Sequence, residues 1–161
     1  MAKRIDPRIY NNFIDANVLD RMGDGHDDAV DEMLSLYDDG KITLLMPHSV
    51  KAEIEHPNTP AKVKTRAMGI IFTEPVTLTP NEVERHRQVR NLVQGNALPG
   101  THDRDAYHVV EAEKHGGGYF VTRDERLLKM GREISALLMT VEVVSPTEFM
   151  RKYQEFAASG R

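Results

Sequence analysis

Four acidic residues from distant parts of the chain could act together at one site. They are Asp15, Glu53, Asp105 and Asp124. Asp15 ends a predicted strand and Asp124 follows one by two residues, whereas Glu53 and Asp105 lie in helices that follow or precede one. An open parallel sheet binds its ligands beyond the carboxyl ends of its strands. Bare carboxylates packed together repel one another, and a divalent cation removes that conflict. We therefore expect a metal site in which these four acids are the ligands and the catalytic residues.

The donor atoms predict the kind of ion. All four side chains bind through oxygen, and no thiolate or histidine belongs to the predicted cluster, because His108 and His115 are expected to lie outside it. Oxygen ligands favour Mg²⁺ or Mn²⁺ over zinc. Such an ion polarises a phosphoryl oxygen and lowers the pKa of a bound water, and two ions can hold both oxygens of an in-line displacement. The chemistry indicated is hydrolysis of a phosphodiester bond.

Each acid also has a purely structural interpretation, which stays open at this point. Asp15 and Asp124 could each cap the helix that follows, because Asp is a preferred N-cap residue. Glu53 could be a solvated helix residue, with Glu55 on a different face as its substitute. Asp103 is interpreted as the N-cap of its own helix or, alternatively, as a fifth acid at the same edge. The shared position at one sheet edge, rather than any single acid, favours a site.

Apolar spacing and turn signals predict the elements that would position these acids. Strands are expected over residues 10–15, 41–46, 119–122 and 140–144. Helices are expected within 20–39, from Pro47 to about Glu55, after Thr59-Pro60, from Thr79 to about Gln94, over 101–115, over 125–130 and from Ser145 onward. Thr59 is predicted to be an N-cap with Pro60 at the first helical position, and capping boxes are predicted at Thr79 and Ser145. This alternation predicts an α/β fold, a three-layer α/β/α sandwich around a mostly parallel sheet of four to five strands.

Length and composition exclude several classes of protein. The 161 residues predict one domain over residues 1–156 and a flexible tail over 157–161. The 25 acids and 21 bases give a net charge of −4, so a nucleic acid would need a local basic patch or a metal. The absence of Cys excludes disulfides, zinc–thiolate sites and Cys nucleophiles. Without a signal peptide or an apolar run of about 20 residues, we expect a cytoplasmic protein with no membrane association.

Four short segments resemble the motifs of one nuclease family. Residues 13–19 (FIDANVL) resemble the opening motif of PIN-domain nucleases, and residues 49–54 (SVKAEI) are similar to the second acidic motif, which places its Glu on Glu53. Residues 105–110 (DAYHVV) resemble the Asp-Ala helix start of the family, and residues 118–124 (GYFVTRD) resemble its Phe-Val-Thr-x-Asp strand. The segments occur in the order found in that family, and the resemblance extends from about Tyr10 to Phe149.

The resemblance implies a PIN-like domain that cleaves RNA with Mg²⁺ or Mn²⁺, often as a homodimer. In size and layout the chain is most similar to VapC-type toxins, which a cognate antitoxin protein inhibits. The segment 58–100, with its two capped helices, is longer than a minimal toxin of this type needs. Asn17 and Thr122 would support the metal ligands, and the choice of Asp124 over Asp103 as the last acid is open because that position varies in the family.

The basic residues and the remaining histidines suggest further roles and alternatives. Arg104 and Arg123 adjoin the predicted ligands and are candidates to contact the scissile phosphate. The bases of 62–66 and 85–90 are interpreted as solvated helix faces or, alternatively, as a phosphate-contacting surface. A catalytically degenerate module that binds RNA or protein is the main alternative function. An HD-type phosphohydrolase, suggested by the histidines and His102-Asp103, is disfavoured because those enzymes are all-helical.

Overall fold

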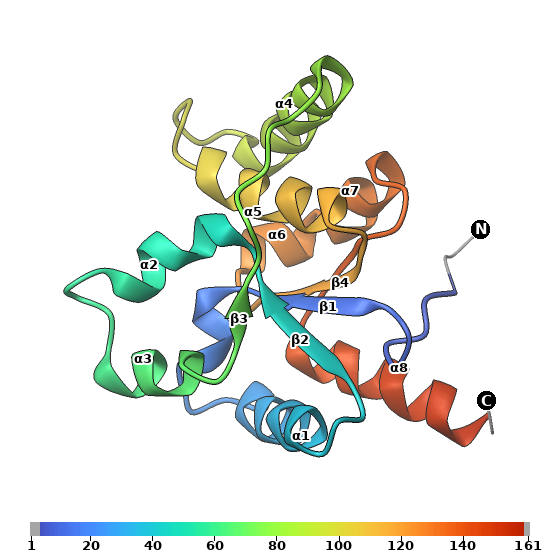
Figure 1. Cartoon of the computed structure of the whole chain (residues 1–161). Helices are drawn as coiled ribbons and strands as arrows, with labels where there is room; N and C mark the ends of the chain where they lie inside the picture. Colours follow the sequence, from blue (N-terminus) through green and yellow to red (C-terminus); the bar gives the residue numbers. More distant parts are fainter. Residues whose placement is uncertain (1–3, 160–161) are drawn as a thin grey trace.

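The computed structural model describes residues 4–159 and contains a single sheet of five parallel strands. The order across the sheet is β3-β2-β1-β4-β5, and every neighbouring pair is parallel (Figure 1). The strands are β1 (Asn11–Ile14), β2 (Thr43–Met46), β3 (Ile71–Phe72), β4 (Gly117–Val121) and β5 (Glu142–Val144). The predicted fold class is confirmed, since helices cover both faces of this sheet.

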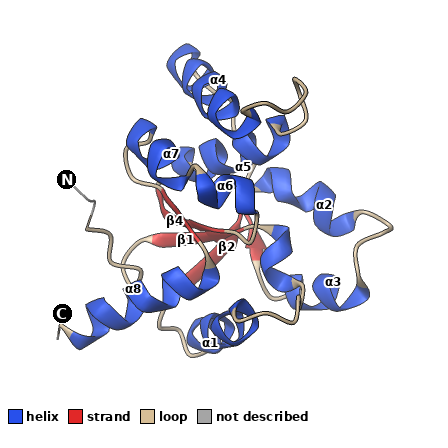
Figure 2. Ribbon diagram, turned by 180° about the vertical axis from the view of Figure 1, so that it is seen from behind, coloured by secondary structure: helices blue, strands red, loops and turns tan. Residues whose placement is uncertain are grey.

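The helices form two layers around the sheet. Figure 2 shows α1, α3 and α8 on one side and α4, α5, α6 and α7 on the other. The α-helices are α1 (His26–Asp38), α2 (Lys51–Glu55), α3 (Ala61–Ala67), α4 (Pro80–Gln94), α5 (Asp103–Lys114), α6 (Glu125–Lys129), α7 (Gly131–Leu137) and α8 (Pro146–Ala158). Two 3-10 helices, η1 (Ala16–Leu19) and η2 (His48–Val50), follow β1 and β2 directly. No helix among residues 4–159 is long and apolar enough to cross a membrane.

The central strands divide their side chains between two hydrophobic cores. Phe13 of β1 and Phe120 of β4 are fully buried in the core beneath α5, α6 and α7. Ile14, Tyr119 and Val121 point to the opposite core, beneath α1 and α8. Alternate residues of a strand point to opposite faces, so a strand covered on both faces reads as a continuous apolar run. This burial fixes the register of β1 against β4 and therefore the position of the residues that follow them.

The helix ends agree in part with the sequence predictions. The capping box at Thr79 is confirmed, because Thr79 and Glu82 exchange side chain to backbone hydrogen bonds in both directions. Only half of the second box is present: Ser145 accepts from the Glu148 N–H, whereas the Glu148 carboxylate pairs with Arg151. The predicted cap at Thr59 is wrong, since its hydroxyl donates to the Glu53 carbonyl and thereby ties α3 to α2.

Two elements and two boundaries also differ from the sequence predictions. The two-residue strand β3 and helix α7 were not predicted, because both are short and β3 is an edge strand that pairs with β2 alone. The three glycines before Tyr119 were predicted to be a connection, but Gly117 and Gly118 belong to β4. The predicted tail begins too early, since α8 continues through Ala158; residues 160–161 lie outside the described residues.

Gly117 gives a direct test of the packing between β4 and β1. A Cβ atom on Gly117 would lie 2.7 Å from Cδ2 of Phe13 and 3.0 Å from the Ala112 carbonyl oxygen. We expect Gly117→Ala to lower the free energy of unfolding by about 1–3 kcal/mol, as overpacking of a filled core does. Urea unfolding measures this change. Gly69→Ala is the matched control, because a Cβ there meets nothing within 4 Å. Equal stability of the two variants would contradict the packing described here.

Candidate metal centre

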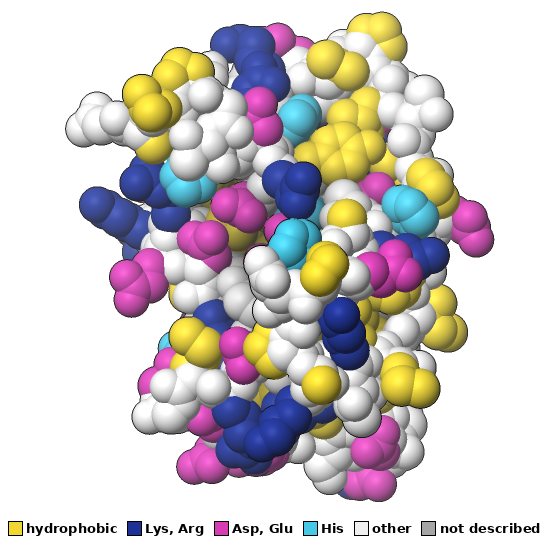
Figure 3. Space-filling model, turned by 90° about the vertical axis from the view of Figure 1, so that its left-hand side faces the viewer, with side chains coloured by type: hydrophobic (Ala, Val, Ile, Leu, Met, Phe, Trp, Pro, Cys, Tyr) yellow, Lys and Arg dark blue, Asp and Glu magenta, His cyan; other side chains and the backbone are white. Residues whose placement is uncertain are grey.

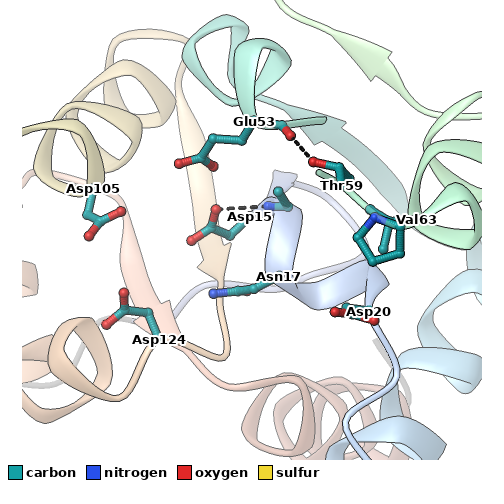
Figure 4. A pocket seen from close by; sticks show the side chains of 10 residues that line it. Asp15, Asn17, Asp20, Glu53, Thr59, Val63, Asp105 and Asp124 are labelled. Carbon is teal, nitrogen blue, oxygen red and sulfur yellow. Dashed lines mark hydrogen bonds between the residues drawn. The ribbon is translucent and has the colours of Figure 1, made fainter. Parts of the chain in front are cut away.

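The four predicted acids line one pocket at the carboxyl edge of the sheet. The pocket has a volume of about 290 Å³, and we call it the acidic pocket. Figure 4 shows the carboxylates of Asp15, Glu53, Asp105 and Asp124 around a common space. A fifth acid, Asp20 at the end of η1, also lines the pocket and was not predicted as part of it. Asp103 and Glu55 do not line it.

Four different elements bring these acids together. Asp15 is the first residue after β1, and Asp124 is the third residue after β4. Glu53 lies in α2, which follows β2 through η2, and Asp105 lies in the first turn of α5. Because β1, β2 and β4 are parallel neighbours, their carboxyl ends meet at one edge. Helix α5 leads back to the start of β4, so its N-terminal turn lies at that same edge.

Asp15 is the most deeply buried of the four, with only 4% of its surface exposed. One carboxylate oxygen accepts the Ala16 N–H at 2.8 Å, and the other accepts the Thr122 hydroxyl at 3.0 Å. Burial above all, together with the Glu53 and Asp105 charges, raises the pKa of Asp15 to about 6 against the opposing effects of His108 and the Thr122 hydrogen bond. The N-cap interpretation of Asp15 is confirmed, and it is compatible with the site interpretation because the cap uses one oxygen only.

His108 completes the cluster, contrary to the sequence prediction. Its ring is fully buried, and its Nε2 lies 3.3 Å from Oε1 of Glu53 without a hydrogen bond of good geometry. One ligand atom from each of Asp15, Glu53 and His108 lies within 4.8 Å of the other two. The signal was present in the sequence: His108 is three residues after Asp105, so the two share a helix face. The expectation of an all-oxygen cluster is therefore wrong.

The charges around His108 raise its pKa. Burial disfavours the charged ring, but the Glu53 contact and the charges of Asp15 and Asp105 outweigh burial and raise the pKa of His108. Burial and the neighbouring charge of Asp124 raise the pKa of Asp105, which His102 opposes from 3.4 Å. Several groups of the cluster thus compete for protons or another cation, as crowded carboxylates do.

Asn17 and Thr122 connect the ends of β1 and β4. The Asn17 amide donates to the Thr122 hydroxyl at 3.3 Å and accepts the Arg123 N–H at 3.0 Å. The Thr122 hydroxyl also accepts the Asp124 N–H at 3.0 Å. These bonds hold Asp15 and Asp124 at a fixed separation. Asp124 caps α6 with one oxygen, which accepts two backbone N–H groups and leaves the other oxygen for the pocket.

Two predicted residues have other partners. Asp103 faces α4, where its carboxylate lies 3.7 Å from Nε of Arg90, and it is not the N-cap of α5, which is His102. Arg123 is only 5% exposed and pairs with Asp24 at 3.0 Å and Asp27 at 2.9 Å. It holds the loop before α1, so it is not free to contact a phosphate. Arg104, the other phosphate candidate, is exposed on the first turn of α5.

The donors fit a divalent cation. Nε2 of His108 is a buried ring nitrogen without a hydrogen-bond partner, and it faces two carboxylates. Asp15, Glu53 and His108 could hold an ion, with Asp105 and Asp124 completing the pocket. Comparison with protein-family models and with curated proteins found no match to this chain. The geometry and chemistry of the site therefore carry the functional argument.

Arg123 should stabilise the folded state through its ion pairs. Arg123→Met leaves the Asp27 carboxylate, which is 12% exposed, without its partner. We expect a loss of about 2 kcal/mol in the free energy of unfolding, because removing one member of a buried ion pair leaves an uncompensated charge. Chemical denaturation measures it, and Arg104→Met is the control, with an expected change within about 0.5 kcal/mol. If both variants were as stable as the wild type, Arg123 would not anchor the loop.

The buried Asp15 carboxyl should make stability fall with rising pH. Its folded pKa of about 6 exceeds the ordinary value of 3.8, so the protonated carboxyl contributes its full stabilisation below about pH 4, and this contribution is lost as pH rises through 6. In EDTA, Asp15→Asn should thus be more stable than the wild type at pH 7.5, with a smaller difference at pH 4.5. One pKa unit corresponds to about 1.4 kcal/mol, so the difference is at most about 3 kcal/mol. Urea unfolding at both pH values measures it, and a wild type more stable at pH 7.5 would contradict it.

Proposed function

We propose that this chain is a metal-dependent ribonuclease of the PIN-domain type, which hydrolyses phosphodiester bonds of RNA. The observation that carries the proposal is the convergence of Asp15, Glu53, Asp105 and Asp124 on one pocket at the carboxyl edge of a parallel sheet. These are the four acids that the motif resemblance assigns to the site. A buried carboxylate cluster with raised pKa values in a pocket is typical of a functional site.

The residues of the pocket have distinct tasks in this proposal. Asp15 would hold the ion from the end of β1 and Glu53 from α2, and Thr122 would keep the Asp15 carboxylate oriented. Asp105 and Asp124 line the pocket from α5 and from the end of β4, where they can hold a water or accept its proton. A bound Mg²⁺ or Mn²⁺ supplies Lewis acidity for the phosphoryl oxygen and the attacking water.

A groove beside the acidic pocket supports a nucleic-acid substrate. It has a volume of about 580 Å³, shares Asp20 and Pro60 with the pocket, and carries Arg21, Lys62 and Arg66; we call it the basic groove. Arg21 and Arg66 share one partner, Asp31, whereas Lys62 has no ion pair among the described residues, so the groove keeps an excess of positive charge. Figure 3 faces the side of α2 and α3 and shows clusters of Lys and Arg side chains beside acidic ones. A chain with a net charge of −4 needs such a local patch to attract a polyanion. We therefore propose that the RNA strand lies along the basic groove and enters the acidic pocket from it.

The resemblance to VapC-type toxins extends this proposal to partners. A homodimer and an inhibitory antitoxin protein would follow from it. Cleavage of RNA by the isolated chain is the primary test, because neither partner is needed for it.

Two aspartates of α5 form a matched pair for testing the proposal. Asp105 lines the acidic pocket, whereas Asp103 lies in the same helix turn and faces Arg90 of α4. In Mn²⁺, Asp105→Asn and Asp15→Asn should each lower the cleavage rate of a mixed RNA panel at least about 100-fold. Asp103→Asn should stay within about threefold of the wild type, and EDTA should abolish cleavage by all of them.

The controls separate loss of chemistry from loss of fold. Circular dichroism should show the wild-type spectrum for all three variants. A folded wild type that binds RNA in Mn²⁺ but does not cleave it would overturn the proposal in favour of a catalytically degenerate binding module. An equal loss of cleavage in Asp103→Asn and Asp105→Asn would show that the acidic pocket is not the active site.

A further inference from the structure

A chain of buried polar groups lies behind the acidic pocket and has no task in the function proposed above. Glu111 of α5 is 1% exposed, and its Oε1 accepts both the Ser49 N–H at 2.8 Å and the Ser49 hydroxyl at 2.9 Å. The same Ser49 hydroxyl lies 2.7 Å from Nδ1 of His108. An acid in the interior of a helix against the core is rarely kept without a role, because its burial costs free energy. These hydrogen bonds link the Glu111 carboxylate to His108 through Ser49.

These contacts determine which nitrogen of His108 carries hydrogen. A serine hydroxyl has one hydrogen to donate, and the hydroxyl of Ser49 donates it to Glu111. It must therefore accept a hydrogen bond from Nδ1–H of His108. In the neutral ring, the other nitrogen, Nε2, then has no hydrogen and presents a lone pair. Glu111 thus selects the tautomer of His108 without touching it.

Nε2 lies beside two carboxylates of the acidic pocket, those of Asp15 and Glu53. Nε2 is buried, has no hydrogen-bond partner, and belongs with the Asp15 and Glu53 carboxylates to the group of atoms within 4.8 Å of one another. With the ring neutral, the Nε2 lone pair and the two carboxylates repel one another, and either a proton on Nε2 or a bound cation removes that repulsion. A metal-bound histidine characteristically donates its other N–H to an oriented acceptor, and Ser49 is that acceptor here.

We propose that His108 is a nitrogen ligand of the metal, that Ser49 and Glu111 position it, and that the site therefore prefers Mn²⁺ to Mg²⁺. This inference rests on the metal site of the proposed function. Mg²⁺ prefers an octahedral shell of oxygen, whereas imidazole suits first-row transition ions. Carboxylates alone would give little reason for that preference, so the preference follows from His108.

Pulsed electron paramagnetic resonance of Mn²⁺ bound to the full chain tests the ligand directly. We expect a ¹⁴N coupling in the wild type that His108→Gln abolishes, together with a fall of about 10- to 100-fold in Mn²⁺ affinity. His102→Asn is the matched control, because His102 contacts Asp105 and is a further ring nitrogen beside the pocket. The coupling should persist in that variant. Mn²⁺ bound without a ¹⁴N coupling, or a coupling that survives in His108→Gln, would overturn the proposal.

Ser49 tests the positioning role with His108 left in place. Ser49→Ala removes the acceptor of Nδ1–H, so we expect about a tenfold loss of Mn²⁺ affinity with a much smaller change in Mg²⁺ affinity. Ser49→Thr restores a hydroxyl and should recover most of the loss. Calorimetric titration with each ion measures both affinities. Equal losses for the two ions would indicate a purely structural role for Ser49 and overturn this part of the proposal.

The outcomes distinguish this inference from the proposed ribonuclease activity. RNA cleavage that depends on Asp15, with bound Mn²⁺ but no nitrogen coupling, would refute the role of His108 and leave the ribonuclease intact. A nitrogen coupling without RNA cleavage would support the ligand and refute the ribonuclease. If His108→Gln does not fold, the wild-type spectrum and the Ser49 variants still decide, because both keep the histidine. No Mn²⁺ binding by the folded wild type would overturn both.

Discussion

The burial of the Asp15 carboxylate is the constraint on which the rest of the site depends. Parallel strands bury β1 on both faces, and the residue that follows it is still enclosed at the sheet edge. A charged group in that position costs free energy unless it has partners. The Ala16 N–H, the Thr122 hydroxyl and the charge of His108 supply those partners. Each comes from a different element, so the elements must pack in one arrangement for the carboxylate to be tolerated.

Helix α5 connects this site to the rest of the fold. Its first turn brings Asp105 to the pocket, and its second turn brings His108. The next turns bury Glu111 against Ser49 and use Glu113 to accept the backbone N–H groups that precede β5. The apolar residues between them pack in the core with Phe13 and Phe120. A rotation of this helix would therefore disturb the site and the core together, so packing determines which side chains reach the pocket.

The site also shows a conflict between stability and function. The carboxylates of Asp15 and Glu53 lie close to His108, with Asp105 and Asp124 in the same pocket, and the raised pKa values of Asp15 and Asp105 report the cost. Hydrogen bonds from Asn17 and Thr122 keep the groups in place in spite of their repulsion. A cation that binds the folded state alone would offset this cost and stabilise the fold. Such strain is expected of a site that binds a charged ligand, and a core built for stability alone would lack it.

The sequence by itself determined the class of fold and the edge at which chemistry is possible. Apolar runs, the capping box at Thr79 and the strand ends before Asp15 and Asp124 are local signals, and each depends on residues within one or two turns. Local signals also placed Glu53 and Asp105 at the same edge, because parallel topology leaves few alternatives.

Only the tertiary structure decided which polar residues share the pocket. Asp103 and Asp105 are two residues apart, yet one faces Arg90 and the other the acidic pocket, because successive helix positions turn by about 100°. Arg123 was expected near a phosphate, but it pairs with Asp24 in the loop before α1 and with Asp27 in the first turn of α1, about 100 residues earlier. His108 joined the acids although the sequence prediction left it outside. The rotation of a helix and the reach of a side chain are set by long-range packing, which no local pattern specifies.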